Sequence, residues 1–189
     1  MKKGKLIVFS APSGAGKTTI VKHLLNCQRF QLAFSVSATT RRPRVSERSD
    51  LDYYFIESDD FLSKVKAGEF LEYQQVYEGF YYGTLKSEIT RLRNLGKNII
   101  FDVDVHGGLN IKAMYPDDCL AVFVSVPSLD VLEERLRKRN TETEEQFKMR
   151  LQKAQKEISL KKHFDAILVN DKLEQTLQEA EAMLDKYLS

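Results

Sequence analysis

Apolar residues along the 189-residue chain gather in short runs that alternate with longer amphipathic stretches. Short apolar runs are typical of buried strands in a parallel sheet, and apolar residues recurring every three or four positions are typical of helices with one buried face. We expect strands at residues 6–9, 32–36, 98–104, 119–126 and 164–169. We expect helices at residues 18–25, 58–67, 84–94, 107–115 and 172–188, and two more that begin near residues 129 and 144. This alternation predicts an α/β fold with a parallel core sheet and helices on both faces.

A segment in the middle of the chain departs from this alternation. Residues 37–44 are polar, contain a proline and predict a loop. Residues 52–56 and 69–77 have the composition of strands, and a turn at Gly79 leads into the tyrosine-rich residues 80–83. Tyrosines can line a polar pocket, or they can be ordinary strand residues. The pattern alone leaves both interpretations open.

Signals for helix starts frame several of these elements. Ser58 and Ser128 are predicted N-caps, and residues 143–146 have the pattern of a capping box. The leucines at positions 129, 132 and 136 are expected to face the core.

The composition is that of a soluble globular protein, with 42% apolar and 30% charged residues. The 29 basic and 27 acidic residues leave a net charge of only +2, so no overall field draws the chain to nucleic acid or to a membrane surface. No apolar run approaches the length that spans a bilayer, and the N-terminus does not resemble a signal peptide. We therefore expect a cytoplasmic protein whose partners include neither nucleic acid nor membrane.

The cysteines and histidines show no functional pattern in the sequence. Cys27 and Cys119 suit a reducing compartment, and we expect both to be small apolar fillers. The three histidines, His23, His106 and His163, have no metal-ligand spacing among themselves, which gives zinc no support.

A glycine-rich turn follows the first apolar run and ends in Gly16, Lys17 and Thr18, where a helix is expected to begin. This is the arrangement of a phosphate-binding loop, in which backbone N–H groups and a helix N-terminus face an anion and a lysine adds a full charge. Ala11 stands where the consensus has its first glycine. The sequence therefore predicts a phosphate site, with an ordinary strand-to-helix turn as the alternative.

Two acidic residues end the apolar run at 98–104. Alternation along a strand places Asp102 and Asp104 on the same face, at the carboxyl end where α/β sheets bind ligands. Two acids at that position are costly unless a cation or a polar ligand meets them. Beside a phosphate loop, Asp102 is the expected partner of a magnesium ion.

Arginines form two further clusters. Arg41, Arg42 and Arg44 stand among hydroxyl residues in the predicted loop, as an anion clamp or as a solvated basic loop. Arg135 and Arg139 are four residues apart on a predicted helix, where like charges repel unless an anion lies between them. A phosphate loop, an acid-ended strand and late arginines together suggest phosphoryl transfer between nucleotides.

With these motifs in place, the chain resembles the guanylate kinases. The resemblance rests on residues 10–17, 35–44, 52–53, 69–72, 81–84, 102–104 and 139–144, which run in the family's order between residue 4 and about residue 188. It implies transfer of the γ-phosphoryl group of ATP to GMP, giving ADP and GDP, with Mg²⁺ as cofactor and dGMP as a second acceptor. One departure is His106, where the family usually has glutamine, so the role of that side chain is open.

The resemblance also implies a P-loop three-layer fold divided into three parts. The core would comprise residues 1–34, 86–126 and 160–189. A GMP-binding subdomain would be inserted at 35–85, and a helical lid would span 127–159.

Site residues follow from the same resemblance. The ATP phosphates would be held by Ala11, Pro12, Ser13, Gly14, Ala15, Gly16, Lys17 and Thr18, with Asn170 and Asp171 near the adenine. The metal would be held by Thr18 and Asp102. The GMP phosphate would be held by Arg41, Arg44, Tyr53 and Tyr82, and the guanine by Ser37, Glu72, Thr84 and Asp104. The catalytic set would be Lys17, Arg135, Arg139 and Arg150.

Two alternatives differ from this interpretation. One is a non-enzymatic module like the guanylate-kinase-like domains of membrane scaffolds, which typically have a damaged phosphate loop; the loop is complete here. The other keeps the fold but takes another acceptor, such as a phosphorylated sugar, against which the base-reading set argues. The oligomeric state is not determined by the sequence, and a homo-oligomer stays open.

Overall fold

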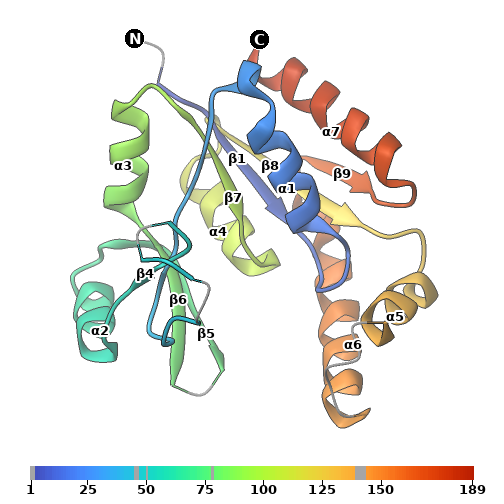
Figure 1. Ribbon diagram of the computed structural model, residues 1–189, viewed down its shortest axis with the longest axis horizontal. Helices are drawn as coiled ribbons and strands as arrows, with labels where there is room; N and C mark the ends of the chain where they lie inside the picture. Colours follow the sequence, from blue (N-terminus) through green and yellow to red (C-terminus); the bar gives the residue numbers. More distant parts are fainter. Residues whose placement is uncertain (1–2, 45–46, 50, 78, 139–143) are drawn as a thin grey trace.

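The structure, a computed structural model, describes residues 3–44, 47–49, 51–77, 79–138 and 144–189 (Figure 1). Its core is a five-stranded sheet in the order β2-β7-β1-β8-β9, and every pairing in it is parallel. The strands are β1 (Leu6–Ser10), β2 (Leu32–Phe34), β7 (Asn98–Asp102), β8 (Cys119–Ser125) and β9 (Ala166–Val169). The predicted α/β fold with a parallel core sheet is therefore confirmed.

Both faces of the core sheet are covered because β1 is apolar on both sides. Ile7 and Phe9 pack with helices α1 (Lys17–Asn26) and α7 (Leu173–Leu188) on one face. Leu6 and Val8 pack with α3 (Lys86–Asn94) and α4 (Val105–Met114) on the other. These four apolar side chains of β1 have no exposed surface, as expected for a central strand of a doubly covered sheet. A short 3₁₀ helix, η1 (Gln28–Phe30), joins α1 to β2.

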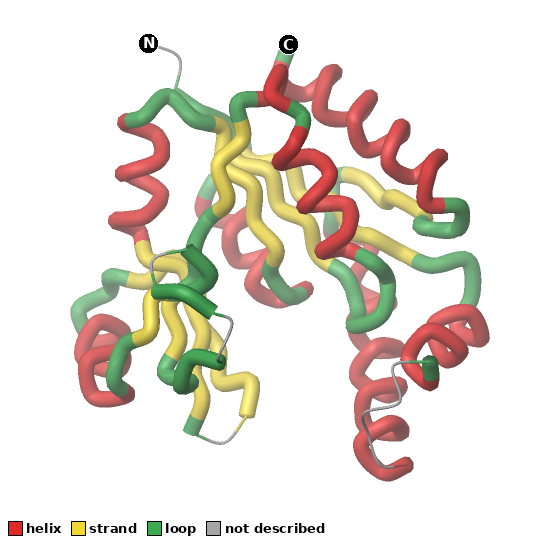
Figure 2. The backbone as a smooth tube through the Cα atoms, in the orientation of Figure 1, coloured by secondary structure: helices red, strands yellow, loops and turns green. Residues whose placement is uncertain are grey.

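A second, four-stranded sheet lies beside the core, in the order β4-β3-β6-β5. It contains β3 (Ala38–Thr39), β4 (Tyr54–Phe55), β5 (Phe70–Tyr77) and β6 (Phe80–Leu85), and α2 (Ser58–Lys66) covers it. Figure 2 shows this sheet as a separate group of strands below the core sheet. Phe61 of α2 and Phe70 of β5 stack at 4.3 Å between ring centroids in its small core.

The second sheet corrects several boundaries expected from the sequence. Ala38 and Thr39 are not loop residues: Ala38 is fully buried and pairs with Gly83 on one side and Tyr54 on the other. Thr84 lies in β6 rather than in a helix because it pairs with Glu72 across the hairpin. Ser58 is the first residue of α2 and not its N-cap. The N-cap is Glu57, whose side chain forms no capping hydrogen bond.

Helices α5 (Leu129–Arg137) and α6 (Glu144–Ser159) extend from the edge of the core sheet, on the side opposite the second sheet (Figure 1). Ser128 caps α5 as predicted, by accepting a hydrogen bond from the Val131 amide over 3.2 Å. Leu132 and Leu136 are buried, but Leu129 is 40% exposed, because the first turn of α5 lies beyond the core. The predicted capping box lies partly outside the described residues, since residue 143 is not among them. The 3₁₀ helix η2 (Leu160–His163) follows α6.

Among the described residues, no helix combines the length and the apolar character needed to cross a lipid bilayer.

Candidate active site

The loop between β1 and α1 adopts a conformation that depends on its glycines. Gly14 and Gly16 have φ values of +92° and +89°, in the left-handed region that favours glycine. A side chain at Gly16 would also overlap the Asn170 amide. That amide, buried beyond the end of β9, donates to the Ala15 carbonyl over 2.8 Å. This hydrogen bond from Asn170 therefore stabilises the conformation of the loop.

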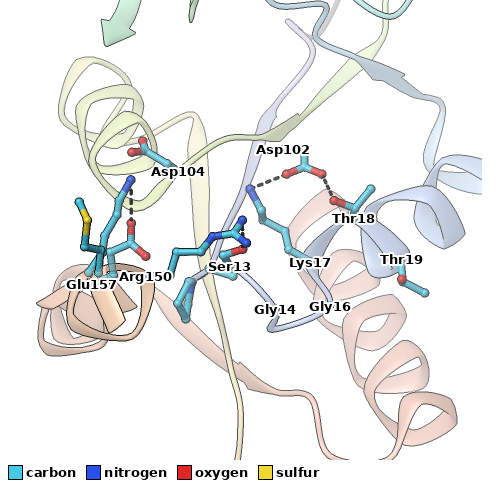
Figure 3. A pocket seen from close by; sticks show the side chains of 14 residues that line it. Ser13, Gly14, Gly16, Lys17, Thr18, Thr19, Asp102, Asp104, Arg150 and Glu157 are labelled. Carbon is cyan, nitrogen blue, oxygen red and sulfur yellow. Dashed lines mark hydrogen bonds and ion pairs between the residues drawn. The ribbon is translucent and has the colours of Figure 1, made fainter. Parts of the chain in front are cut away.

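A cavity of about 630 Å³ opens over this loop (Figure 3). It is lined by Ala11, Pro12, Ser13, Gly14, Gly16, Lys17, Thr18, Thr19, Asp102, Asp104, Met149, Arg150, Lys153 and Glu157. The loop, the carboxyl end of β7 and helix α6 thus contribute its walls, as expected for a ligand site at this edge of an α/β sheet.

Lys17, Thr18 and Asp102 form one connected group within the cavity. Lys17 forms an ion pair with Asp102, and its ammonium also donates to the Val103 carbonyl over 2.6 Å. The Thr18 hydroxyl donates to the other carboxylate oxygen of Asp102 over 2.8 Å. Hydroxyl and carboxylate oxygens side by side are the hard donors that Mg²⁺ prefers, so this group fits such an ion.

Asp104 does not share a strand face with Asp102, which corrects the prediction. Strand β7 ends at Asp102, and Asp104 is the N-cap of α4, where its Oδ1 accepts from the Gly107 amide over 2.8 Å. Its Oδ2 is buried, with no hydrogen-bond partner among the described residues. The helix, rather than the strand, therefore orients this carboxylate.

Glu72 and Thr84 meet on the neighbouring strands β5 and β6. The Thr84 hydroxyl donates to Glu72 Oε1 over 2.7 Å, and Glu72 is only 9% exposed. A methyl group added at Gly107 would lie 3.0 Å from Glu72 Oε2 and 3.1 Å from Asp104 Oδ1, so both carboxylates approach this glycine. Burial raises the pKa of Glu72, the charge of Asp104 raises it further, and the Thr84 hydrogen bond opposes the shift.

Ser37 is half-buried and lies directly before β3. Its carbonyl accepts a hydrogen bond from the Tyr54 amide over 2.9 Å. The second sheet thus holds the backbone of Ser37 in position.

Arg41, Tyr53 and Tyr82 form a second cluster on the second sheet. Arg41 Nε donates to the Tyr82 hydroxyl over 3.1 Å, and the guanidinium carbon lies 5.5 Å from the centroid of the Tyr53 ring. Glu47, which the sequence analysis missed, accepts from Arg41 over 2.8 Å and from the Arg44 amide over 2.8 Å. No sequence pattern singles out Glu47, because polar loops commonly contain both acidic and basic residues.

Of the three late arginines, the structure describes Arg135 and Arg150. Arg150 on α6 lines the cavity and donates to the Ser13 hydroxyl over 3.3 Å, linking α6 to the phosphate loop. Arg135 is not among the residues that line the cavity; it donates to the Asp171 carbonyl at 3.5 Å. Arg139 lies outside the described residues. Of the two described arginines, the structure therefore brings Arg150 to the loop.

Glu157 and Lys153 on α6 are cavity residues that the sequence analysis missed. Glu157, labelled in Figure 3, is only 6% exposed. Lys153 Nζ lies 3.8 Å from its Oε1. Burial raises the pKa of Glu157, and Asp104 raises it further, while Lys153, His106 and Lys17 lower it. A glutamate in a charged amphipathic helix is typical of a solvent-facing position, so no local signal distinguished it.

Comparisons with known proteins show what the chain is similar to. Residues 3–187 match the family model described as guanylate kinase. The chain is 44% identical to a guanylate kinase of Porphyromonas gingivalis over 185 residues, which cover 98% of each chain. It is 43% identical to a guanylate kinase of Bacteroides thetaiotaomicron over 186 residues, 98% of this chain and 91% of that one. Among solved structures, a guanylate kinase from Anaplasma phagocytophilum superposes with a TM-score of 0.74 at 26% identity, covering 99% of this chain and 88% of that chain.

Proposed function

This chain belongs to the guanylate kinase family, so it is an ATP-dependent GMP phosphotransferase, and we propose that the cavity over the phosphate loop is where the transfer occurs. The γ-phosphoryl group of ATP passes to the phosphate of GMP, giving ADP and GDP.

The observation that carries the choice of acceptor is the buried pair of Glu72 and Thr84. Guanine presents N1–H and a 2-amino group, two donors that one carboxylate accepts together. Adenine has a lone pair at N1 and no 2-amino group, so the carboxylate would be left buried and unpaired. A site built on such hydrogen bonds can reject the wrong base by about 10⁴-fold.

Ser37 and Asp104 complete the proposed guanine site. Asp104 Oδ2 is a buried acceptor without a partner among the described residues, and Asp104 Oδ1 and Glu72 Oε2 both lie beside Gly107. A donor from the base would satisfy the unpartnered oxygen. The same set accepts dGMP, because all of these contacts are assigned to the base and none to the ribose.

The phosphate of GMP is assigned to Arg41, Arg44, Tyr53 and Tyr82. Arg41 and the two tyrosines already lie together, and Glu47 neutralises Arg41 in this arrangement. A phosphate carries more negative charge than a carboxylate, so it competes with Glu47 for the guanidinium. Phosphate binding would thus exchange one anionic partner of Arg41 for another.

The donor side is assigned to residues 11–18, with Asn170 and Asp171 toward the adenine. Backbone N–H groups of the loop and the Lys17 ammonium bind the phosphate chain of ATP. Thr18 and Asp102 would hold Mg²⁺, which when bound neutralises phosphate charge. Lys17 then changes partner, from Asp102 to the phosphates.

Transfer needs no general base in this scheme. The acceptor is a phosphate oxygen of GMP, and because the second phosphate pKa is about 6, it is already an anion near neutral pH. The protein therefore works by aligning donor and acceptor and by neutralising charge. Lys17 and Arg150 face the cavity, and we assign Arg135 and Arg139 to the same task once the lid closes and excludes water.

We also propose the three-part division, with the core at 1–34, 86–126 and 160–189, the GMP-binding subdomain at 35–85 and the lid at 127–159. The separate sheet β4-β3-β6-β5 and the protruding helices α5 and α6 support it. A cytoplasmic location is supported by the free thiols of Cys27 and Cys119, which suit a reducing compartment.

An acceptor panel tests this proposal. The folded protein is supplied with ATP and Mg²⁺, and ADP release is measured with GMP, dGMP, AMP, UMP or a sugar phosphate. We expect ADP with GMP and dGMP and about 10⁴-fold lower kcat/KM with AMP. Turnover of the sugar phosphate alone would assign another acceptor, and no ADP with any acceptor would contradict kinase activity.

A further inference from the structure

The end of α1 farthest from the phosphate loop carries a second group of chemically active side chains. His23 and Cys27 are four residues apart, so they lie on the same side of this helix end, and Glu181 comes from α7, which packs against α1. One ligand atom of each residue lies within 4.8 Å of the other two. We propose that His23, Cys27 and Glu181 form a binding site for Zn²⁺ that joins α1 to α7.

The donor set points to zinc. Imidazole, thiolate and carboxylate are the three ligand types that Zn²⁺ uses, whereas Mg²⁺ and Ca²⁺ prefer oxygen donors alone. Three protein ligands leave the fourth tetrahedral position for water. The side chains of His23 and Glu181 are 35% and 26% exposed, so an ion can enter from solvent without unfolding the helix pair.

Two of the three distances between ligand atoms are close to those of a tetrahedral site, and the third, between Cys27 and Glu181, is within 4.8 Å. His23 Nε2 lies 2.6 Å from Glu181 Oε1 and 4.0 Å from Cys27 Sγ. Zinc bonds of about 2.0–2.3 Å at tetrahedral angles separate neighbouring ligand atoms by about 3.3–3.6 Å. The N–O pair must therefore open, and the N–S pair must close, by about half an ångström or slightly more. Side-chain rotation supplies shifts of this size while the backbone stays in place.

Arg29 orients the carboxylate for this role. Its guanidinium donates to Glu181 Oε2 over 2.5 Å and to Asp185 Oδ1 over 3.2 Å, so Glu181 Oε1 is the oxygen that faces His23. Hydrogen bonds from outside the ligand set commonly fix metal-binding carboxylates in this way. The charges of Zn²⁺, the Cys27 thiolate, Glu181, Arg29 and Asp185 cancel, so the ion would not leave an excess charge between the helices.

The site differs from the magnesium site in place and in chemistry. Thr18 lies at the start of α1 and contacts Asp102 at the end of β7, whereas this group lies at the other end of α1. The histidines alone do not reveal it, because its other donors are a cysteine and a glutamate from a helix more than 150 residues later. The proposal does not depend on the kinase function.

Cobalt titration of the metal-free full chain is the direct test. Co²⁺ occupies zinc sites, and a four-coordinate thiolate site gives a near-ultraviolet charge-transfer band together with intense visible absorption. We expect this spectrum at one equivalent of Co²⁺, its loss in Cys27→Ala and its retention in Cys119→Ala. Cys119 is a matched control because its thiol is buried in a different part of the core and does not belong to this group. A wild-type protein without the thiolate band at saturating Co²⁺ would overturn the proposal.

Thermal unfolding with Zn²⁺ gives an independent readout. At a hundredfold excess of Zn²⁺ over its Kd, Tm should rise by about 5–10 °C in the wild type and in His163→Gln. His23→Gln should lose this rise, which also covers the case in which Cys27→Ala fails to fold. An equal rise in His23→Gln and Cys27→Ala would place the ion elsewhere and leave His23 and Glu181 as a hydrogen-bonded link between helices.

Discussion

The Thr84 hydroxyl donates to Glu72 Oε1 over 2.7 Å, and neither side chain is more than 9% exposed. Because this bond occupies one carboxylate oxygen, it fixes the orientation of the other, Oε2, which lies beside Gly107 and Asp104. The pair joins two strands of the second sheet to the N-terminus of α4. A change at Glu72 should therefore affect the choice of acceptor base more than the fold.

Glu72→Gln should lower kcat/KM for GMP by about 10–100-fold, because losing a hydrogen bond to a charged acceptor costs about 1.5–3 kcal/mol. It should affect AMP much less, since adenine gains nothing from the carboxylate. Steady-state kinetics with both acceptors measures this change. The control is Glu69→Gln, because the carboxylate of Glu69 is half-exposed and pairs with Lys64. An unchanged ratio of GMP to AMP would remove Glu72 from base recognition.

Glu157→Gln should stabilise the protein near neutral pH by on the order of 1 kcal/mol, because it removes a buried charge that Lys153 only partly compensates. Burial raises the folded-state pKa of Glu157 above its ordinary value of 4.5. The folded state then binds more protons than the unfolded state between these two pKa values, so wild-type stability falls as pH rises through that window.

The gain in Glu157→Gln should accordingly be small below pH 4.5, the ordinary pKa value, and should grow above it. Urea unfolding of both proteins between about pH 4 and pH 8 measures the difference. Glu145→Gln, an exposed position on the same helix, should show no such pH-dependent gain. A loss of stability at neutral pH would mean that the Glu157 carboxylate is better compensated than its burial indicates.

Asp102→Asn should raise the Mg²⁺ concentration for half-maximal activity by about 10–100-fold, which is the usual loss of metal affinity when a residue that supports a metal site is changed. Asparagine keeps the shape and can still accept from Thr18, but it loses the charge that meets Lys17 and the cation. Activity against Mg²⁺ concentration is the measurement, with the exposed Asp117→Asn as control. If the two variants respond alike to Mg²⁺, Asp102 has no part in holding the metal.

Arg150→Ala should lower kcat by about 10²-fold with a smaller change in KM, because its charge is needed most where negative charge is shared between donor and acceptor. Arg150 already contacts Ser13 of the phosphate loop. The exposed Lys148→Ala on the same helix controls for loss of surface charge. A kcat within twofold of wild type would exclude this role.

Arg139→Ala should also lower kcat by at least about 10²-fold, by comparison with other arginines that act in the transition state. Single-turnover measurements of the two arginine variants separate transfer from product release. A normal rate of transfer in Arg139→Ala would assign that residue to another step.

Local pattern was sufficient for the parts of the protein whose structure depends on neighbouring residues. The loop at residues 11–16, the apolar strands of the core and the Ser128 cap each follow from a short sequence pattern that is typical of one local structure. Family resemblance added residues such as Glu72 and Thr84, which the structure brings into contact. The roles of these residues stay predictions that the experiments above decide.

Other features required the tertiary structure because they join residues far apart in sequence. Asp104 became a helix cap because β7 ends two residues earlier, and Asn170 reaches the loop at Ala15 from the end of β9. Glu157 faces the cavity although its helix is largely charged. Periodicity predicts which face of an element is buried, but packing decides what that face meets. By itself, the sequence determined the phosphate loop and the parallel core; only the folded chain placed Glu157 in the cavity and His23 beside Glu181.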